Sequence, residues 1–163
     1  MKRGLVVRAL LLDRDGTLNV DHGYVHTPAQ FTWVEGAIDA VKYANDAGVL
    51  VLVVTNQSGI ARGFYDEAAF HALCEWMRAE LARHGARIDG FYFCPHGPDD
   101  GCNCRKPLPG MIERATREWG FDRATSVLVG DSERDIEAAV AAGVRGVRYT
   151  SGSLLDLVRR ALL

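Results

Sequence analysis

Short, nearly continuous apolar runs recur along this chain, and they constrain its fold more than any other feature. The run at 49–54 reads Val-Leu-Val-Leu-Val-Val, with no polar residue on either face of an extended strand. Such strands are typical of parallel sheets that helices cover on both sides, whereas alternating apolar and polar residues indicate a sheet with one face in water. The sequence therefore predicts a sheet that is buried on both faces.

Segments with helical periodicity lie between the apolar runs. We expect helices at 36–46, 67–84, 109–119, 133–142 and 153–162, and strands at 6–12, 49–55, 91–93, 126–130 and 145–149. This alternation predicts an α/β fold with a doubly wound, Rossmann-like, mostly parallel sheet. We see no insertion large enough to form a separate cap domain.

Length and charge narrow the class of protein. A chain of 163 residues is expected to form a single domain over 1–163. Its 19 basic and 21 acidic side chains give a net charge of −2, so we expect no nucleic-acid partner. No apolar run approaches the roughly 18 residues of a membrane helix, and no secretion signal is visible near the N-terminus. We therefore expect a cytoplasmic protein without a membrane partner, and a monomer.

Acidic and hydroxyl residues follow three of the predicted strands. Asp13 and Asp15 follow the first apolar run, and Gly16 allows a sharp turn directly after them. Taken alone, this segment is equally consistent with an ordinary Asx-turn. Ligands of open α/β sheets bind at the carboxyl ends of strands, so we expect Asp13, Thr55 and Asp131 to lie together. Together with Asp13 and Asp15, Asp131 would give an oxygen-rich pocket, which suits Mg²⁺.

Two further segments favour binding of a phosphate. The hydroxyl, amide and backbone N–H groups of 55–59 suit a cluster of anionic oxygens. Lys106 supplies a cation that can neutralise charge during phosphoryl transfer, although an Arg-Lys pair is also common on solvated surfaces. Asp135 is assigned a structural role, since Ser132 is a suitable N-cap that places Asp135 in the first helical turn.

A cluster of cysteines with one histidine predicts a second metal site. Cys94, His96, Cys102 and Cys104 match the tetrahedral ligand set of Zn²⁺. If all four bind, no open position remains, so the zinc should be structural and should staple a loop with little apolar content. A chance cluster of cysteines beside a surface histidine is the alternative. Because Cys104 precedes Arg105, zinc would also fix where the neighbouring cations point.

The ordered set of motifs from residue 13 to residue 135 resembles the haloacid dehalogenase (HAD) superfamily. The resemblance implies Mg²⁺-dependent phosphoryl transfer through an aspartyl-phosphate. It implies that Asp13 is the nucleophile, that Asp15 is the general acid and base, and that Thr55 and Lys106 bind the phosphoryl oxygens. It also implies that Asp13, Asp131 and the backbone carbonyl of Asp15 hold the Mg²⁺.

Three segments, 19–26, 55–63 and 104–107, resemble the family of D-glycero-D-manno-heptose 1,7-bisphosphate 7-phosphatases. That resemblance implies hydrolysis of the C7 phosphate to heptose 1-phosphate, a precursor of ADP-heptose for lipopolysaccharide or of GDP-heptose for other glycans. It leaves the α or β anomer open. Arg105 would bind the distal phosphate, and the implied substrate contacts are Asp21, His22, Gly23, Tyr24, Thr55, Asn56, Gln57, Ser58, Arg105 and Lys106.

Two departures from that family keep alternatives open. Ser132 stands where some relatives have a lysine, and only five residues separate His96 from Cys102. Such a short loop is nearer that of the related histidinol-phosphate phosphatases, which are the first alternative. The second is a catalytically silent, zinc-stapled binding module, but such a module would not need all of Asp13, Asp15, Thr55, Lys106 and Asp131. The charge balance argues against a polynucleotide 3′-phosphatase.

Overall fold

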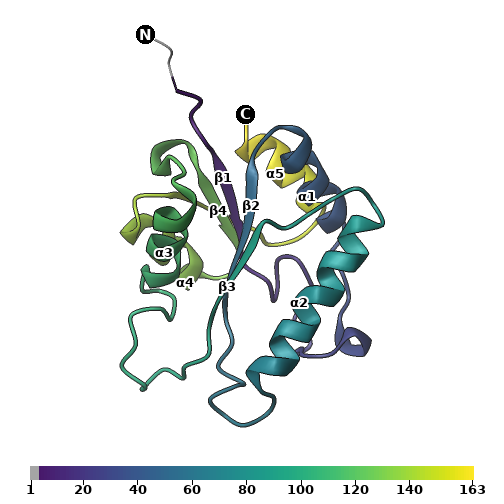
Figure 1. Ribbon diagram of the computed structural model, residues 1–163, viewed down its shortest axis with the longest axis vertical. Coiled ribbons are helices and arrows are strands. Elements are labelled where there is room, and N and C mark those ends of the chain that lie inside the picture. The colour runs from purple at the N-terminus through teal and green to yellow at the C-terminus, as the bar shows by residue number, and fades with distance from the viewer. Residues whose placement is uncertain (1–3) are drawn as a thin grey trace.

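A five-stranded parallel sheet forms the centre of the computed structural model, which describes residues 4–163. The strands lie in the order β3-β2-β1-β4-β5 (Figure 1). Their bounds are β1 (Ala9–Leu12), β2 (Leu50–Asn56), β3 (Gly90–Cys94), β4 (Val127–Gly130) and β5 (Arg145–Arg148). The doubly wound fold predicted from the apolar runs is confirmed.

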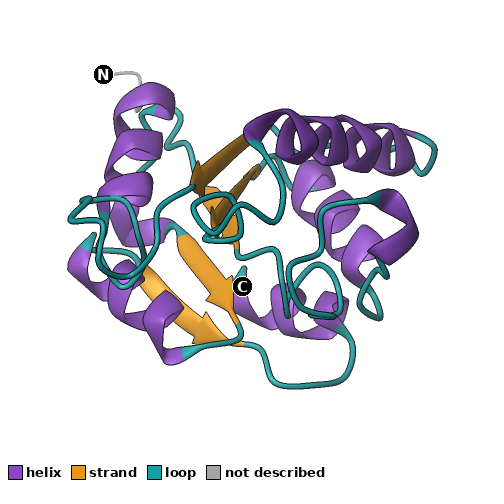
Figure 2. Ribbon diagram, turned by 90° about the horizontal axis from the view of Figure 1, so that it is seen from below, coloured by secondary structure: helices purple, strands orange, loops and turns teal. Residues whose placement is uncertain are grey.

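Helices cover both faces of this sheet (Figures 1 and 2). They are α1 (Ala37–Asp46), α2 (Glu67–Ala82), α3 (Gly110–Trp119), α4 (Glu133–Ala141) and α5 (Leu154–Ala161). Buried residues of α1, α2 and α5 form one hydrophobic core with one face of the sheet, and those of α3 and α4 form a second core with the other face. Short 3-10 turns lie at Pro28–Gln30 and Arg123–Thr125.

The central strand β1 shows why a continuous apolar run is needed. Successive side chains of a strand point to opposite faces, and here Leu10 and Leu12 enter the first core while Ala9 and Leu11 enter the second. All four side chains are fully buried. A polar residue at any of them would lose its hydration without gaining a partner.

The predicted start of β1 at residue 6 is wrong, because the strand begins at Ala9. Val6 and Val7 are 61% and 39% exposed. The ladder to β2 begins with the pair Ala9 and Leu50, so no neighbouring strand extends far enough to pair with these two valines. Apolar character predicted the run correctly, but a strand also needs hydrogen-bonding partners.

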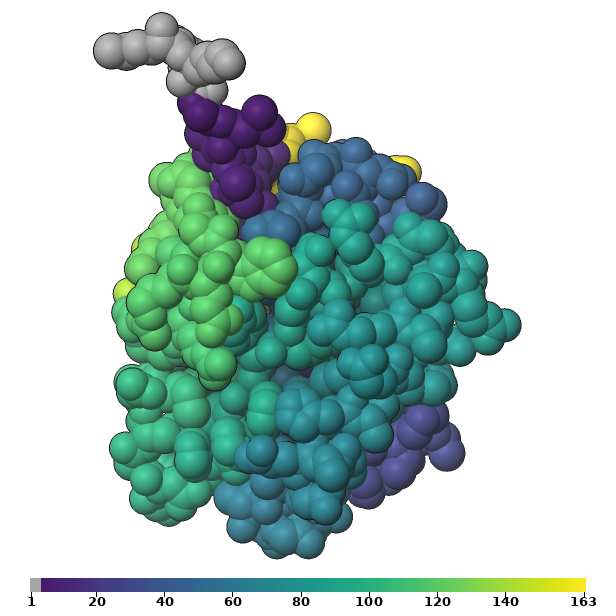
Figure 3. All heavy atoms as spheres, viewed as in Figure 1, coloured from purple at the N-terminus to yellow at the C-terminus, as the bar shows by residue number. Residues whose placement is uncertain are grey.

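The strand order places a functional site at one edge of the sheet. The chain runs outward from β1 through β2 to β3, and then returns to the other side of β1 for β4 and β5. Ligands bind outside the carboxyl ends of the strands where the order reverses. Those ends point to the lower end of the molecule in Figure 1, away from the N-terminus, and loops cover that end in the space-filling view of Figure 3.

Among the described residues, the longest helices are too short and too polar to span a bilayer.

The buried central strand yields a prediction about stability. Replacing Leu11 by Ala should lower the free energy of unfolding by about 2–5 kcal/mol. Leu11 is fully buried, so the substitution leaves a cavity that the surrounding side chains cannot readily fill. Leu5→Ala is the matched control, since Leu5 is 98% exposed and should change stability by less than about 0.5 kcal/mol. Urea denaturation measures both, and equal values for the two variants would contradict this account of the core.

Candidate active site

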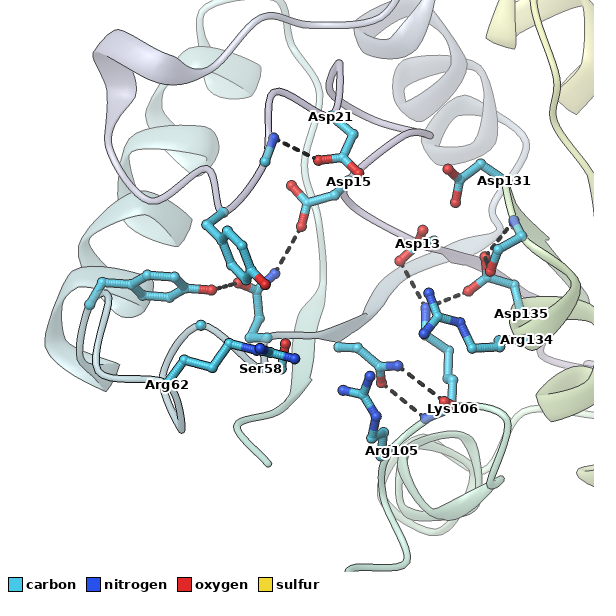
Figure 4. Close-up of a pocket in the computed structure, with 17 residues that line it drawn as sticks. Asp13, Asp15, Asp21, Ser58, Arg62, Arg105, Lys106, Asp131, Arg134 and Asp135 are labelled. Carbon is cyan, nitrogen blue, oxygen red and sulfur yellow. Dashed lines mark hydrogen bonds and ion pairs between the residues drawn. The ribbon is translucent and has the colours of Figure 1, made fainter. Parts of the chain in front are cut away.

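A cavity of about 420 Å³ opens at the reversal point of the sheet (Figure 4). Its walls come from the loops after β1, β2 and β4 and from Arg105 and Lys106, which precede α3. Asp13, Asp15 and Asp131 all line it, as their places after the strands predicted. The cavity therefore collects carboxylates and cations from segments that are far apart in the sequence.

Asp13 lies at the carboxyl end of β1, where its backbone N–H donates to the carbonyl of Val129 at 3.0 Å. Its side chain is nearly buried, and its Oδ1 accepts a hydrogen bond from Lys106 Nζ at 2.8 Å. Burial raises the pKa of Asp13 to about 8; the charge of Lys106 opposes this rise, and the nearby carboxylate of Asp135 adds to it. A cation bound beside Asp13 would favour the charged carboxylate.

Lys106 is a buried ammonium with a complete set of partners. Its Nζ donates to Asp13, to Asp135 and, at 2.8 Å, to the carbonyl oxygen of Val54. An ammonium has three N–H donors, so all of them are used. Burial lowers the pKa of Lys106, but the charges of Asp13 and Asp135 outweigh it and raise the pKa above its ordinary value. Lys106 therefore stays charged beside Asp13.

Asn56, at the end of β2, holds the backbone of Lys106. Its Nδ2 donates to the Lys106 carbonyl at 3.1 Å, and its Oδ1 accepts from the Lys106 N–H at 2.9 Å. We expected Asn56 to contact substrate, and it does line the cavity. However, both the nitrogen and the oxygen of its side-chain amide bond the backbone of Lys106. In this structure, Asn56 therefore positions the cation next to Asp13.

The carboxylate of Asp15 is held by donors from three residues. Arg14, which is fully buried, donates to it at 2.9 Å, Asn19 Nδ2 at 3.0 Å and Gln57 Nε2 at 3.1 Å. Gln57 also donates to Thr55 Oγ1 at 2.9 Å, so one amide joins the predicted acid/base to the predicted phosphate ligand. Thr55 itself is buried and is not part of the cavity lining.

Three carboxylates form a cluster at the base of the cavity. Oxygen atoms of Asp13, Asp131 and Asp135 lie within 4.8 Å of one another. A set made only of oxygen ligands fits Mg²⁺. Asp135 was expected to be structural, and it does accept from the backbone N–H and hydroxyl of Ser132, both at 3.1 Å. It also carries the ion pair with Lys106, so it belongs to the site as well as to the helix cap.

Gly16 leaves the space that this cluster of carboxylates needs. The residue has a φ of +87°, and a Cβ atom there would collide with the carboxylate of Asp131. Glycine is therefore needed at this turn for two reasons, its left-handed backbone and the approach of Asp131. Asp15 was expected in the oxygen-rich pocket with Asp13 and Asp131, but its carboxylate lies outside this cluster. Its backbone carbonyl is the ligand that the family resemblance implies.

The predicted zinc ligands are brought together in part. The sulfur of Cys94 lies 2.8 Å from that of Cys104 and 3.6 Å from that of Cys102. Among residues 4–163, the ring of His96 is not within this group of ligand atoms. The backbone carbonyl of His96 instead accepts a hydrogen bond from Arg105 Nη1 at 3.2 Å. The cysteine loop thus holds the side chain of Arg105 directly.

The structure also separates the other predicted contacts. Asp21, Gly23, Tyr24 and Ser58 line the cavity, but His22 does not, and its ring lies 3.2 Å from the hydroxyl of Thr32. Six lining residues were not assigned to the site from the sequence: Gly59, Arg62, Tyr65, Ser132, Arg134 and Asp135. Arg62 and Gly59 lie within a segment that was singled out, whereas Tyr65 and Arg134 carry no sequence signal of their own.

This chain has the fold and the site of a HAD-like hydrolase. Helices cover both faces of its sheet, two carboxylates follow the first strand, and a buried lysine lies beside an oxygen cluster. The profile of the HAD-hydrolase-like family matches residues 103–157. A D-glycero-beta-D-manno-heptose-1,7-bisphosphate 7-phosphatase from Yersinia pestis is 50% identical over 145 residues, which cover 85% of this chain and 77% of that one. Its counterpart from Escherichia coli strain K12 is 49% identical over 145 residues, with 85% and 76% covered. The chain belongs to this family of heptose bisphosphate phosphatases.

Solved structures support the same placement. The D,D-heptose 1,7-bisphosphate phosphatase of B. bronchiseptica, complexed with magnesium and phosphate, matches with a TM-score of 0.86 and 34% identity. The match covers 96% of this chain and 98% of that one. A putative HAD-like phosphatase from Mesorhizobium loti matches with a TM-score of 0.83 and 33% identity, covering 96% and 86% of the two chains.

The collision at Gly16 yields a prediction about metal binding. Gly16→Ala should abolish Mg²⁺-dependent hydrolysis of para-nitrophenyl phosphate, because the new methyl group displaces the Asp131 carboxylate. Gly120→Ala is the matched control: its φ is +65° and nothing lies near a Cβ there, so it tests backbone strain alone, about 1–2 kcal/mol. A Mg²⁺ titration of both variants separates the effects, and a wild-type Mg²⁺ response in Gly16→Ala would refute the role of Asp131.

Proposed function

We propose that this chain hydrolyses the C7 phosphate of D-glycero-β-D-manno-heptose 1,7-bisphosphate, leaving the heptose 1-phosphate. The observation that carries the proposal is the buried pair of Lys106 and Asp13 beside the carboxylate cluster, in a chain about half identical to phosphatases of that name. The relatives are β-heptose bisphosphate phosphatases by name, which favours the β anomer over the α anomer. They also favour the heptose substrate over histidinol phosphate, which the short cysteine loop had kept open.

The first half of the proposed reaction forms an aspartyl-phosphate. An Oδ atom of Asp13 attacks the phosphorus, and the bond from phosphorus to the C7 oxygen breaks. Asp15 gives a proton to the leaving oxygen. Lys106, already charged and 2.8 Å from Asp13, draws in the phosphoryl group and balances its negative charge. The hydroxyl of Thr55 is proposed as a further phosphoryl contact.

The second half releases inorganic phosphate. Asp15 takes a proton from a water molecule that attacks the phosphorus, and the bond between Asp13 and phosphorus breaks. The donors on Asp15 support this role because they fix the position of the carboxylate beside the cavity. Gln57 also has its own orientation fixed, since the hydroxyl of Tyr65 donates to its Oε1.

Asp13, Asp131 and the backbone carbonyl of Asp15 are the proposed ligands of Mg²⁺, with Asp135 next to them. A bound Mg²⁺ supplies positive charge against the phosphoryl oxygens during transfer. The all-oxygen cluster supports this choice of ion. Asp21, Gly23, Tyr24, Gln57 and Ser58 are the proposed sugar contacts, because all of them line the cavity. The exposed ring of His22 lacks that support.

We further propose that Zn²⁺ binds Cys94, Cys102 and Cys104, with His96 as the fourth ligand. The three clustered sulfurs support this, and sulfur ligands suit zinc. Burial raises the pKa of Cys94, so its thiol needs a metal ion to become the thiolate. The proposed role of zinc is to fix Arg105, whose guanidinium is bonded to the His96 carbonyl. A single domain, a cytoplasmic location and a monomeric state stay predictions.

The function predicts a substrate preference. With Mg²⁺, the protein should release phosphate from the β-heptose 1,7-bisphosphate with a kcat/KM well above that for the α anomer or histidinol phosphate. Asp13→Asn should abolish turnover of every substrate, because an amide cannot attack phosphorus, while circular dichroism shows an intact fold. Phosphate release measures all of these rates. A clear preference for histidinol phosphate, or retained activity in Asp13→Asn, would contradict the proposal.

The zinc site predicts a link between metal content and substrate binding. Removing zinc with a chelator and then restoring Mg²⁺ should lower the Tm, because the loop at 94–104 has little apolar content to hold it. It should also raise the KM for the bisphosphate, because Arg105 loses its anchor on the His96 carbonyl. Adding zinc back should reverse both changes. An unchanged Tm after verified zinc removal would show that the cysteines do not staple the loop.

A further inference from the structure

The active-site cavity shares a wall with a second cavity of about 440 Å³. The second cavity lies beside the cysteine loop, where Gly97, Cys102 and Leu108 line it. Three basic side chains line both cavities: Arg105, Lys106 and Arg134. Lys106 is held between Asp13 and Asp135 at the position proposed for the reacting phosphate, so the two arginines are the cations of this shared wall left for a second anionic group.

Among the described residues, Arg134 has no structural role that would explain its position. It lies in the first turn of α4, where Ser132 and Asp135 bond to each other and Glu133 pairs with Arg148 at 3.5 Å. Its own side chain is exposed, and across residues 4–163 its guanidinium has no hydrogen bond or ion pair. Figure 4 shows this side chain pointing from α4 into the cavity rather than away from it.

Arg105 reaches the same wall from the segment that precedes α3. One of its nitrogens donates to the His96 carbonyl, which fixes the side chain and leaves most of its five N–H donors free. Arg62, the other arginine of the active-site cavity, lines only that cavity and lies across from Arg134 (Figure 4). The shared wall therefore combines one anchored guanidinium with one free guanidinium.

We propose that Arg134 is a second ligand for the phosphate of the substrate that does not react, forming a clamp with Arg105, to which the family resemblance already assigns that phosphate. The inference rests on the proposed function, since it needs a substrate with a second phosphate. A phosphate monoester carries close to two negative charges at neutral pH. Two guanidinium groups match that charge, and each can donate two parallel hydrogen bonds to phosphate oxygens. The reacting phosphate stays at Asp13 and Lys106, and the second phosphate lies toward the cysteine loop.

The clamp is tested by separating bisphosphate binding from phosphoryl transfer. Arg134→Ala should raise the KM for the heptose bisphosphate about tenfold or more, as expected for lost charge-assisted hydrogen bonds. Its kcat, and its hydrolysis of para-nitrophenyl phosphate, should stay near wild type. Arg134→Lys keeps the charge but lacks the planar guanidinium, so its KM for the bisphosphate should lie between those of the wild type and Arg134→Ala. Arg160→Ala removes an exposed arginine outside both cavities and is the matched charge control.

Two results would overturn the clamp. One is a wild-type KM for the bisphosphate in Arg134→Ala. The other is an equal loss on para-nitrophenyl phosphate, which would indicate a general effect on the site. A competition arm keeps this test separate from the proposed function. Fructose 1,6-bisphosphate should inhibit para-nitrophenyl phosphate hydrolysis more strongly than fructose 6-phosphate does, and Arg134→Ala should remove that difference.

The two proposals can therefore fail separately. If the wild-type protein does not hydrolyse the heptose bisphosphate, the proposed substrate is refuted. The clamp still stands if the wild-type protein prefers the bisphosphate inhibitor and Arg134→Ala removes that preference. A wild-type protein with no preference between the two inhibitors, or a preference unchanged by the substitution, would refute the clamp. In either case, para-nitrophenyl phosphate hydrolysis shows that the phosphoryl-transfer machinery is intact.

Discussion

The buried ammonium of Lys106 is the interaction on which the rest of the site depends. It joins Asp13 after β1, the carbonyl of Val54 in β2 and Asp135 in α4, so it ties three elements of the fold to one point. A buried charge is tolerated only when its partners are complete, and removing one partner leaves another charge uncompensated. The proposed nucleophile, the carboxylate cluster and the proposed phosphate-binding cation are thus parts of one electrostatic unit.

The segment that carries the cations is fixed from two directions. Asn56 holds the backbone of Lys106 with two hydrogen bonds, and the His96 carbonyl holds the side chain of Arg105. The first anchor comes from the sheet and the second from the cysteine loop. Positioning at this level matters because transfer rates depend steeply on the placement of the reacting groups. In the proposed reaction, the cysteine loop would therefore affect substrate binding through Arg105, although none of its sulfurs lies at the reacting phosphate.

The sequence predicted the features that follow local rules and missed those that depend on tertiary contacts. Strand ends placed Asp13 and Asp131 correctly, because the carboxyl ends of parallel strands converge. The capping pattern at Ser132 was also recognised, but it hid the second role of Asp135, whose partner Lys106 lies 29 positions away. Asn56 lines the cavity, as expected of a substrate contact, but nothing local shows that its amide also holds the backbone of Lys106. Similarly, the start of β1 depended on where β2 begins.

The strand order also accounts for how one cavity can treat two phosphates differently. The proposed reaction places the reacting phosphate at the reversal point, where loops from both halves of the sheet supply carboxylates and a paired lysine. Arg105 follows β3 on one side of that point, and Arg134 follows β4 on the other, so the proposed clamp spans it as well. Two carboxylates balance the charge of Lys106, which suits a cation that contacts a phosphoryl group only while it is transferred. Guanidinium groups facing solvent-filled space instead suit a phosphate that is only held.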